Sequence, residues 1–97
     1  MKNKEEIIKK IKENLPFLKE TFNVKIIGLF GSYVRGEQRE ESDADILVDF
    51  LKPIGFFKFI ELENYLIEKL EIKVDLIPID ALKSLIKPYI LKEVIYV

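Results

Sequence analysis

The chain has 97 residues, with 16 Lys and Arg against 17 Asp and Glu, so its formal net charge is -1. This length predicts a single domain over residues 1–97 with one hydrophobic core. A near-neutral charge balance provides no basic field that would hold a duplex nucleic acid, so no stable duplex binding is expected. The sequence has no Cys and no His, which excludes disulfides, cysteine nucleophiles and imidazole chemistry. Any metal would need oxygen ligands.

The first predicted element is an amphipathic helix over about residues 4–20. Asn3 and Glu6 form a capping-box pattern, and apolar residues follow at helical spacing: Ile7, Ile8, Ile11, Leu15 and Leu18. Pro16 predicts a kink or a break within this helix. The N-terminal region has no long apolar run for a signal peptide or membrane span, so a cytoplasmic location and no membrane partner are expected.

Two strands with a short helix and a polar loop between them are predicted next. Residues 24–30 are rich in β-branched and aromatic side chains, which favours a buried strand ending at Gly31. A turn at Gly31 and Ser32 is expected to begin a short helix that extends to about residue 36. After the loop over residues 37–42, residues 44–50 predict a second strand.

The second half of the chain predicts a helix, a strand and a short helix. Apolar residues recur at helical spacing over about residues 55–70, and residues 72–77 indicate a third strand. A short helix capped by Asp80 is expected over about residues 80–87. The apolar tail, residues 89–97, has no assigned structure. The second and third strands flank a helix of crossover length, so they are expected to be parallel, whereas the first two are expected to be antiparallel.

A possible phosphate-binding turn lies at Gly31 and Ser32. Gly31 has no Cβ, so the backbone there can approach a phosphate closely, and Ser32 offers a hydroxyl at the start of a helix. The alternative is a simple strand-to-helix turn in which Ser32 is the N-cap residue.

Three carboxylates are the candidate metal ligands and catalytic groups: Asp43, Asp45 and Asp75. Alternation along the second strand places Asp43, Asp45 and Leu47 on one face, and two converging carboxylates repel each other unless a cation lies between them. The alternative is that no metal binds: Ser42 and Asp43 cap the end of the loop, and Asp45 is partly solvated. Asp75 lies in an apolar run, where it is expected to be buried unless the third strand is an edge strand.

Arg35 is a candidate phosphate-binding residue because its planar guanidinium is a fixed cationic donor. Pairing with Glu37, Glu40 or Glu41 on the surface is the equal alternative.

The spacing Gly31-Ser32, ten residues, Asp43-Ala44-Asp45 resembles the signature of the polymerase-β-like nucleotidyltransferase superfamily. The run GSYVRGEQREESDADILVDF is similar to its smallest members, the minimal nucleotidyltransferase (MNT) family of antitoxins. The resemblance is close over residues 27–50 and extends to Asp75 by order and spacing. Val34 departs from the Ala that is common before the family's Arg.

The resemblance implies an α/β (α+β) nucleotidyltransferase fold with a mixed three-stranded sheet in the order 1-2-3. It implies that a nucleoside triphosphate is bound by Gly31, Ser32 and Arg35. It also implies that two Mg²⁺ ions are coordinated by Asp43, Asp45 and Asp75. The implied activity is transfer of AMP from ATP to a tyrosine of a HEPN-domain toxin. A non-catalytic antitoxin and an enzyme acting on a small molecule are the alternatives.

A hetero-complex is also expected, because the later segments contain more large apolar residues than one small core accommodates: Phe56, Phe57, Phe59, Tyr65, Tyr89, Ile90, Ile95 and Tyr96.

Overall fold

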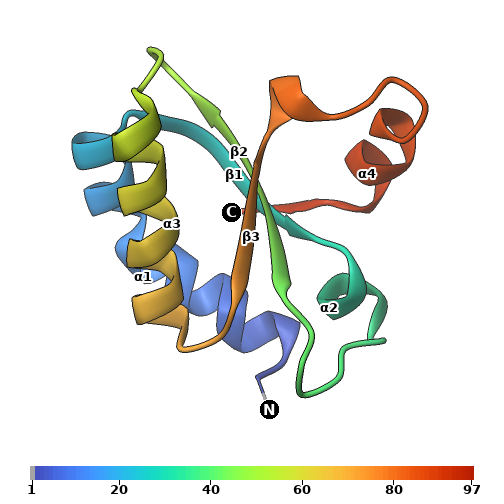
Figure 1. The fold of residues 1–97 in the computed structure, drawn as a ribbon. Coiled ribbons are helices and arrows are strands. Elements are labelled where there is room, and N and C mark those ends of the chain that lie inside the picture. The colour runs from blue at the N-terminus through green and yellow to red at the C-terminus, as the bar shows by residue number, and fades with distance from the viewer. Residues whose placement is uncertain (1) are drawn as a thin grey trace.

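The computed structural model describes residues 2–97. Its helices and strands occur in this order: α1 Lys4–Phe22, β1 Val24–Phe30, α2 Ser32–Arg35, β2 Ala44–Phe50, α3 Phe56–Leu70, β3 Val74–Pro78, a 3-10 turn at Ile79–Ala81, α4 Lys87–Glu93 and β4 Ile95–Tyr96. Helices α1 and α3 lie together on one side of the central sheet, whereas α2 and α4 lie on the other side (Figure 1).

Helix α1 begins as the capping pattern predicted, because the Asn3 side chain accepts a hydrogen bond of 2.9 Å from the Glu6 N–H. The helix continues through Pro16 as one element to Phe22, so the predicted break is wrong. Its apolar stripe faces the core through four buried residues: Ile7, Ile11, Leu18 and Phe22. Burial of this stripe offsets the hydrogen bond that Pro16 cannot donate.

The sheet has the strand order β3-β2-β1-β4. Strands β1 and β2 are antiparallel and β2 and β3 are parallel, which confirms both predicted pairings. The predicted three-stranded sheet was incomplete, because β4 adds a fourth strand antiparallel to β1. Gly28 permits this approach: a Cβ at Gly28 would lie 2.6 Å from Val94 Cγ2 and 2.9 Å from the Ile95 carbonyl oxygen.

The main core lies between the sheet and the helix pair α1 and α3. Successive residues of β2 alternate between the faces, and Ala44, Ile46 and Val48 pack in the core cluster together with the α3 residues Leu62 and Leu66. Full burial of each large aliphatic side chain stabilises the fold by about 1.5–3 kcal/mol. This face of the sheet therefore provides most of the stability.

The C-terminal quarter differs from the prediction. No helix begins at Asp80; residues 79–81 form a single 3-10 turn, and α4 begins at Lys87, where the predicted helix was expected to end. Pro88 lies in the first turn of α4, a position at which its missing N–H costs nothing. None of the residues of α4 is buried.

Strand β3 is an edge strand and begins at Val74, two residues later than predicted. On this edge the Leu76 N–H donates a hydrogen bond of 3.1 Å to the Glu63 carboxylate of α3. Among residues 2–97, no helix is both long enough and apolar enough to cross a membrane.

Candidate functional site

Three carboxylates lie near one another at one end of the sheet. Asp43 directly precedes β2, Asp45 lies within β2, and the parallel register places Asp75 of β3 directly beside Asp45. Partial burial raises the pKa of the Asp45 carboxyl to about 6, with further contributions from the negative charges of Asp75 and then Asp43. A carboxylate whose pKa is raised by two neighbouring carboxylates lies in an anionic site that favours a cation.

The predicted burial of Asp75 is wrong. Its side chain is exposed, because β3 lies at the edge of the sheet, which is the alternative that the sequence left open. Asp75 therefore needs no cation to compensate for burial, and its relation to a metal depends on its position beside Asp45. The loop alternative is correct in part, since the Ser42 hydroxyl accepts a hydrogen bond of 2.8 Å from the Arg39 N–H and Asp45 is only half-buried.

The Gly31 turn lies directly against the Asp45 carboxylate. Phe30, the last residue of β1, pairs with Asp45 across the antiparallel ladder, so Gly31 follows at the level of the site. Gly31 has a φ of +81°, a conformation that favours glycine, and a Cβ at this position would collide with the Asp45 carboxylate. Gly31 is the N-cap residue of α2, so the alternative in which Ser32 caps this helix is wrong. Ser32, half-buried, is the first helical residue.

Helix α2 also brings Tyr33 and Arg35 to the site. Burial raises the pKa of the Tyr33 hydroxyl, and the Asp43 charge adds to this shift, which places Asp43 close to α2. The Arg35 Nε donates to the Glu37 carboxylate at 2.8 Å, which confirms one of the predicted surface pairs. Hydrogen bonds to Glu37 and then to Glu93 raise the pKa of Arg35 above its usual range.

Glu93, the last residue of α4, was not among the residues predicted for the site. Its carboxylate accepts a hydrogen bond of 2.8 Å from the Gly31 N–H and one of 2.6 Å from the Arg35 guanidinium. These contacts join the C-terminal helix to the predicted phosphate-binding turn. Because the residues are about sixty positions apart and the tail had no predicted structure, spacing could not reveal this contact.

Carboxylate oxygens are the ligands that Mg²⁺ prefers, and Asp43, Asp45 and Asp75 provide only such donors. Within the described part of the chain, no three acidic side chains are already arranged as a metal site. This arrangement is compatible with Mg²⁺, which usually takes one or two protein carboxylates and completes its shell with water and substrate phosphates. The donor chemistry therefore fits the ion.

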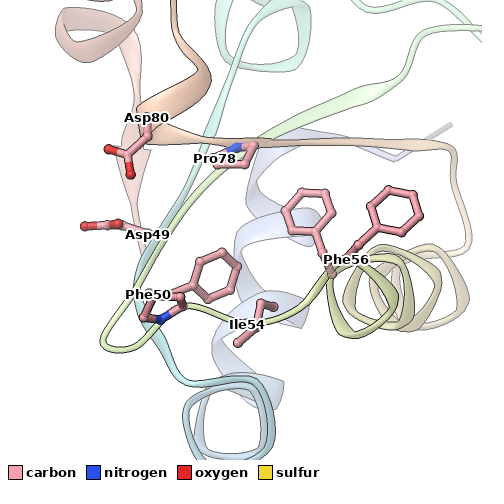
Figure 2. A pocket seen from close by; sticks show the side chains of 8 residues that line it. Asp49, Phe50, Ile54, Phe56, Pro78 and Asp80 are labelled. Carbon is pink, nitrogen blue, oxygen red and sulfur yellow. The ribbon is translucent and has the colours of Figure 1, made fainter.

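A separate pocket of about 400 Å³ lies at the opposite end of β2. Figure 2 shows Phe50, Ile54 and Phe56 on one side of it and the carboxylates of Asp49 and Asp80 on the other. The Gly31 turn and the Asp43–Asp45 pair do not contribute to its lining. This pocket is mainly apolar, which suits contact with an apolar group better than phosphate chemistry.

Comparison with known proteins identifies the family. Residues 5–97 match the model of the nucleotidyltransferase domain. The chain belongs to this family. It is 55% identical over 80 residues to the protein adenylyltransferase MntA of Thermococcus cleftensis, a match that covers 82% of this chain and 81% of that protein. The family and this relative show that the chain is a nucleotidyltransferase of the minimal, MntA-like kind.

Two solved structures are similar to the chain over nearly its whole length. One is a candidate minimal nucleotidyltransferase, with a TM-score of 0.82 and 26% identity; the match covers 97% of this chain and 95% of that one. The other is a toxin-antitoxin complex with AMP-PNP, with a TM-score of 0.69 and 27% identity, covering 98% of this chain and 72% of that one. The nucleotidyltransferase fold is therefore shared.

Proposed function

We propose that residues 1–97 act as one nucleotidyltransferase domain that transfers AMP from ATP to a tyrosine hydroxyl of a HEPN-domain toxin, and so serve as its antitoxin. The observation that carries this proposal is the contact of the Gly31 turn with Asp45, which itself lies beside Asp75. A turn suited to phosphate and a carboxylate set suited to Mg²⁺ thus share one end of the sheet. The similarity to MntA and to a toxin-antitoxin complex with AMP-PNP supports the nucleotide and the partner.

Each side chain at the site has a proposed role. The Gly31 N–H, the Ser32 hydroxyl and the Arg35 guanidinium bind the triphosphate. Asp43 and Asp45 hold Mg²⁺, which when bound neutralises phosphate charge and orients the reacting groups. Asp75, exposed beside Asp45, faces an incoming acceptor and takes its hydroxyl proton. The acceptor oxygen then bonds to the α-phosphorus as the bond to the leaving pyrophosphate breaks.

Exposed apolar side chains support a protein partner. The sequence predicted that the late aromatic and aliphatic residues exceed what one core can bury, and Phe56, Phe57, Tyr89 and Tyr96 are indeed exposed, with Phe57 at 81%. Phe59, Tyr65, Ile90 and Ile95 are partly buried instead. Phe56 and Phe57 are neighbours at the start of α3, with ring centroids 5.7 Å apart, and adjacent exposed aromatic side chains are typical of a surface that is covered in a complex.

The test is co-expression of the chain with an adjacent gene for a HEPN-type protein, followed by the intact mass of that partner. We expect a mass gain in whole AMP units that requires ATP and Mg²⁺ and disappears in Asp43→Asn. Glu13→Gln, an exposed acidic residue of α1, is the matched control and should retain transfer. Stable neutralisation of the toxin without any mass change would favour the non-catalytic antitoxin. Labelling of a small molecule alone would favour an enzyme that acts on small molecules.

A further inference from the structure

The Glu93 carboxylate lies where the proposed function requires a phosphate. Its two oxygens accept separate hydrogen bonds, Oε2 from the Gly31 N–H at 2.8 Å and Oε1 from the Arg35 guanidinium at 2.6 Å. The side chain is largely sheltered, with 20% of it exposed. Glu93 therefore satisfies both donors at once, as a bound anion would.

A carboxylate and a phosphate compete for such donors. Backbone N–H groups and guanidinium groups bind both anions through short, charge-assisted hydrogen bonds. Gly31 has a single N–H, so an oxygen of Glu93 and an oxygen of a ligand cannot both take it with good geometry. Binding of a phosphate at this turn thus requires that Glu93 leave.

The charges around the turn also oppose coexistence. Glu93 lies close enough to Asp45 to contribute to its raised pKa, together with Asp75 and Asp43. Arg35 is the cation that opposes this effect. A triphosphate added beside Glu93 would bring further negative charge to a cluster that already repels it, and the single Arg35 guanidinium would have to compensate two anions at once.

Helix α4, which holds Glu93, is weakly anchored, because none of its residues is buried. The strand that follows is held more firmly: Ile95 and Tyr96 pair with β1, and the Val97 N–H donates a hydrogen bond of 2.9 Å to the Ile27 carbonyl oxygen. Segments with few buried apolar contacts open at low free-energy cost. Displacement of Glu93 therefore does not require the main core between α1, α3 and the sheet to open.

We infer that Glu93 is an internal anion that occupies the phosphate position of the ligand-free chain, and that a bound triphosphate expels it and displaces α4. This inference rests on the proposed phosphate-binding role of Gly31 and Arg35. It makes α4, residues 87–93, a gate for the nucleotide. Glu93 lowers the affinity for nucleotide and keeps both donors paired until a ligand arrives.

The first experiment measures binding of AMP-PNP and of inorganic tripolyphosphate, each with Mg²⁺, by calorimetry. Glu93→Ala should bind both about tenfold more tightly than the wild type, because no internal anion competes. Glu93→Gln retains an acceptor for Gly31 but loses the charge, so a gain of about threefold is expected. Glu37→Gln is the matched control, because Glu37 also pairs with Arg35 but does not contact Gly31, and its affinity should stay within about twofold of the wild type.

Unchanged binding in both Glu93 variants would overturn the inference, and weaker binding would show that Glu93 assists the ligand instead. If Glu93→Ala does not fold, Glu93→Gln decides. If the folded wild type and every variant fail to bind either probe, the proposed phosphate site itself is wrong and Glu93 is only a structural ion pair. The two failures are therefore distinguishable.

The second experiment follows amide hydrogen exchange in α4, residues 87–93. Exchange there should become faster when tripolyphosphate and Mg²⁺ bind to the wild type, because α4 loses its contact with the turn. In Glu93→Ala exchange should already be fast and change little on binding. Slower exchange in the ligand-bound wild type would contradict the displacement of α4.

Discussion

The two faces of the sheet are built in opposite ways. On the face covered by α1 and α3, strands β1, β2 and β3 contribute buried aliphatic side chains, and α3 adds Leu62, Leu66 and Leu70, all of which are at most 1% exposed. On the other face, α2 and α4 surround charged groups, and α4 has no buried residue. Hydrophobic burial thus dominates one face, whereas the other combines the buried Leu47 and Tyr33 with polar contacts such as Arg35 with Glu93.

This difference means that the residues that stabilise the fold are largely distinct from the residues of the candidate site. Because the core lies behind the sheet, the carboxylates at the end of β2 can repel one another without unfolding the chain. The raised pKa of the Asp45 carboxyl means that its ionised form costs stability, and the opposite face offsets that cost. Substitutions on the two faces should therefore have different effects.

The largest effect on stability is expected for Leu62→Ala on the buried face. Leu62 is fully buried, so its truncation leaves a cavity and should lower the free energy of unfolding by about 2–5 kcal/mol. Urea unfolding provides the measurement. Binding of AMP-PNP per folded molecule should be unchanged, and a loss of affinity in the folded fraction would show that the two faces are coupled.

Gly31→Ala should cost less stability but damage the site. The φ of +81° strains any other residue, and the new Cβ would collide with the Asp45 carboxylate. Together these effects should cost about 1–3 kcal/mol. Gly36→Ala is the matched control, because Gly36 has a φ of +74° but no atom within 4 Å of its Cβ position. Equal losses of stability would mean that the Asp45 contact is unimportant.

Asp45→Asn should stabilise the metal-free chain in a pH-dependent way. The pKa of Asp45 is raised to about 6 in the folded state, from 3.8. Below about pH 4 the carboxyl is protonated in both states and costs nothing, whereas stability is lost as pH rises through about 6. Asn cannot ionise and removes this loss. At pH 8 we expect a gain in the free energy of unfolding on the order of 1 kcal/mol, which corresponds to a rise in the melting temperature of about 4–8 °C. Near pH 3 the melting temperature should be unchanged.

Glu13→Gln, on the exposed surface of α1, should show no such pH-dependent gain. A gain in Asp45→Asn that persists at pH 3 would mean that the repulsion among Asp45, Asp75 and Asp43 is not its cause.

The smallest effect on stability is expected for Phe57→Ala. This side chain is 81% exposed, so its removal should change the free energy of unfolding by less than about 0.5 kcal/mol. If the surface binds the partner, the same substitution should weaken the complex by about 1 kcal/mol or more, measured by calorimetry with the toxin. An unchanged affinity would place the partner elsewhere.

Much of the fold could be predicted from local sequence patterns. Strands β1 and β2 and helix α3 agree with their predicted ranges, because long runs with clear periodicity determine local structure. The tail could not be assigned for the opposite reason. Strand β4 has only two residues and depends on the space above Gly28, which is a contact between distant parts of the chain. Pro88 was the overlooked signal for the start of α4.

The site was predictable where family spacing and strand register coincide. Gly31, Asp45 and Asp75 come together because the register of adjacent strands follows from the turn lengths and the hydrophobic pattern. The exposure of Asp75 was mispredicted, because local sequence does not tell whether a short apolar strand lies at the centre or the edge of a sheet. Whether the site residues perform the proposed roles stays a prediction.

The hydrogen bond from Leu76 to Glu63 also bears on self-association. Leu76 lies on the free edge of β3, where an unpaired N–H would invite a strand from another molecule. The Glu63 carboxylate already occupies that donor, charged Lys73 and Asp75 flank it, and Pro78 ends the strand without an N–H to offer. The edge next to Asp45 is thus protected against growth into fibrils, although β3 is exposed there and Asp75 remains accessible.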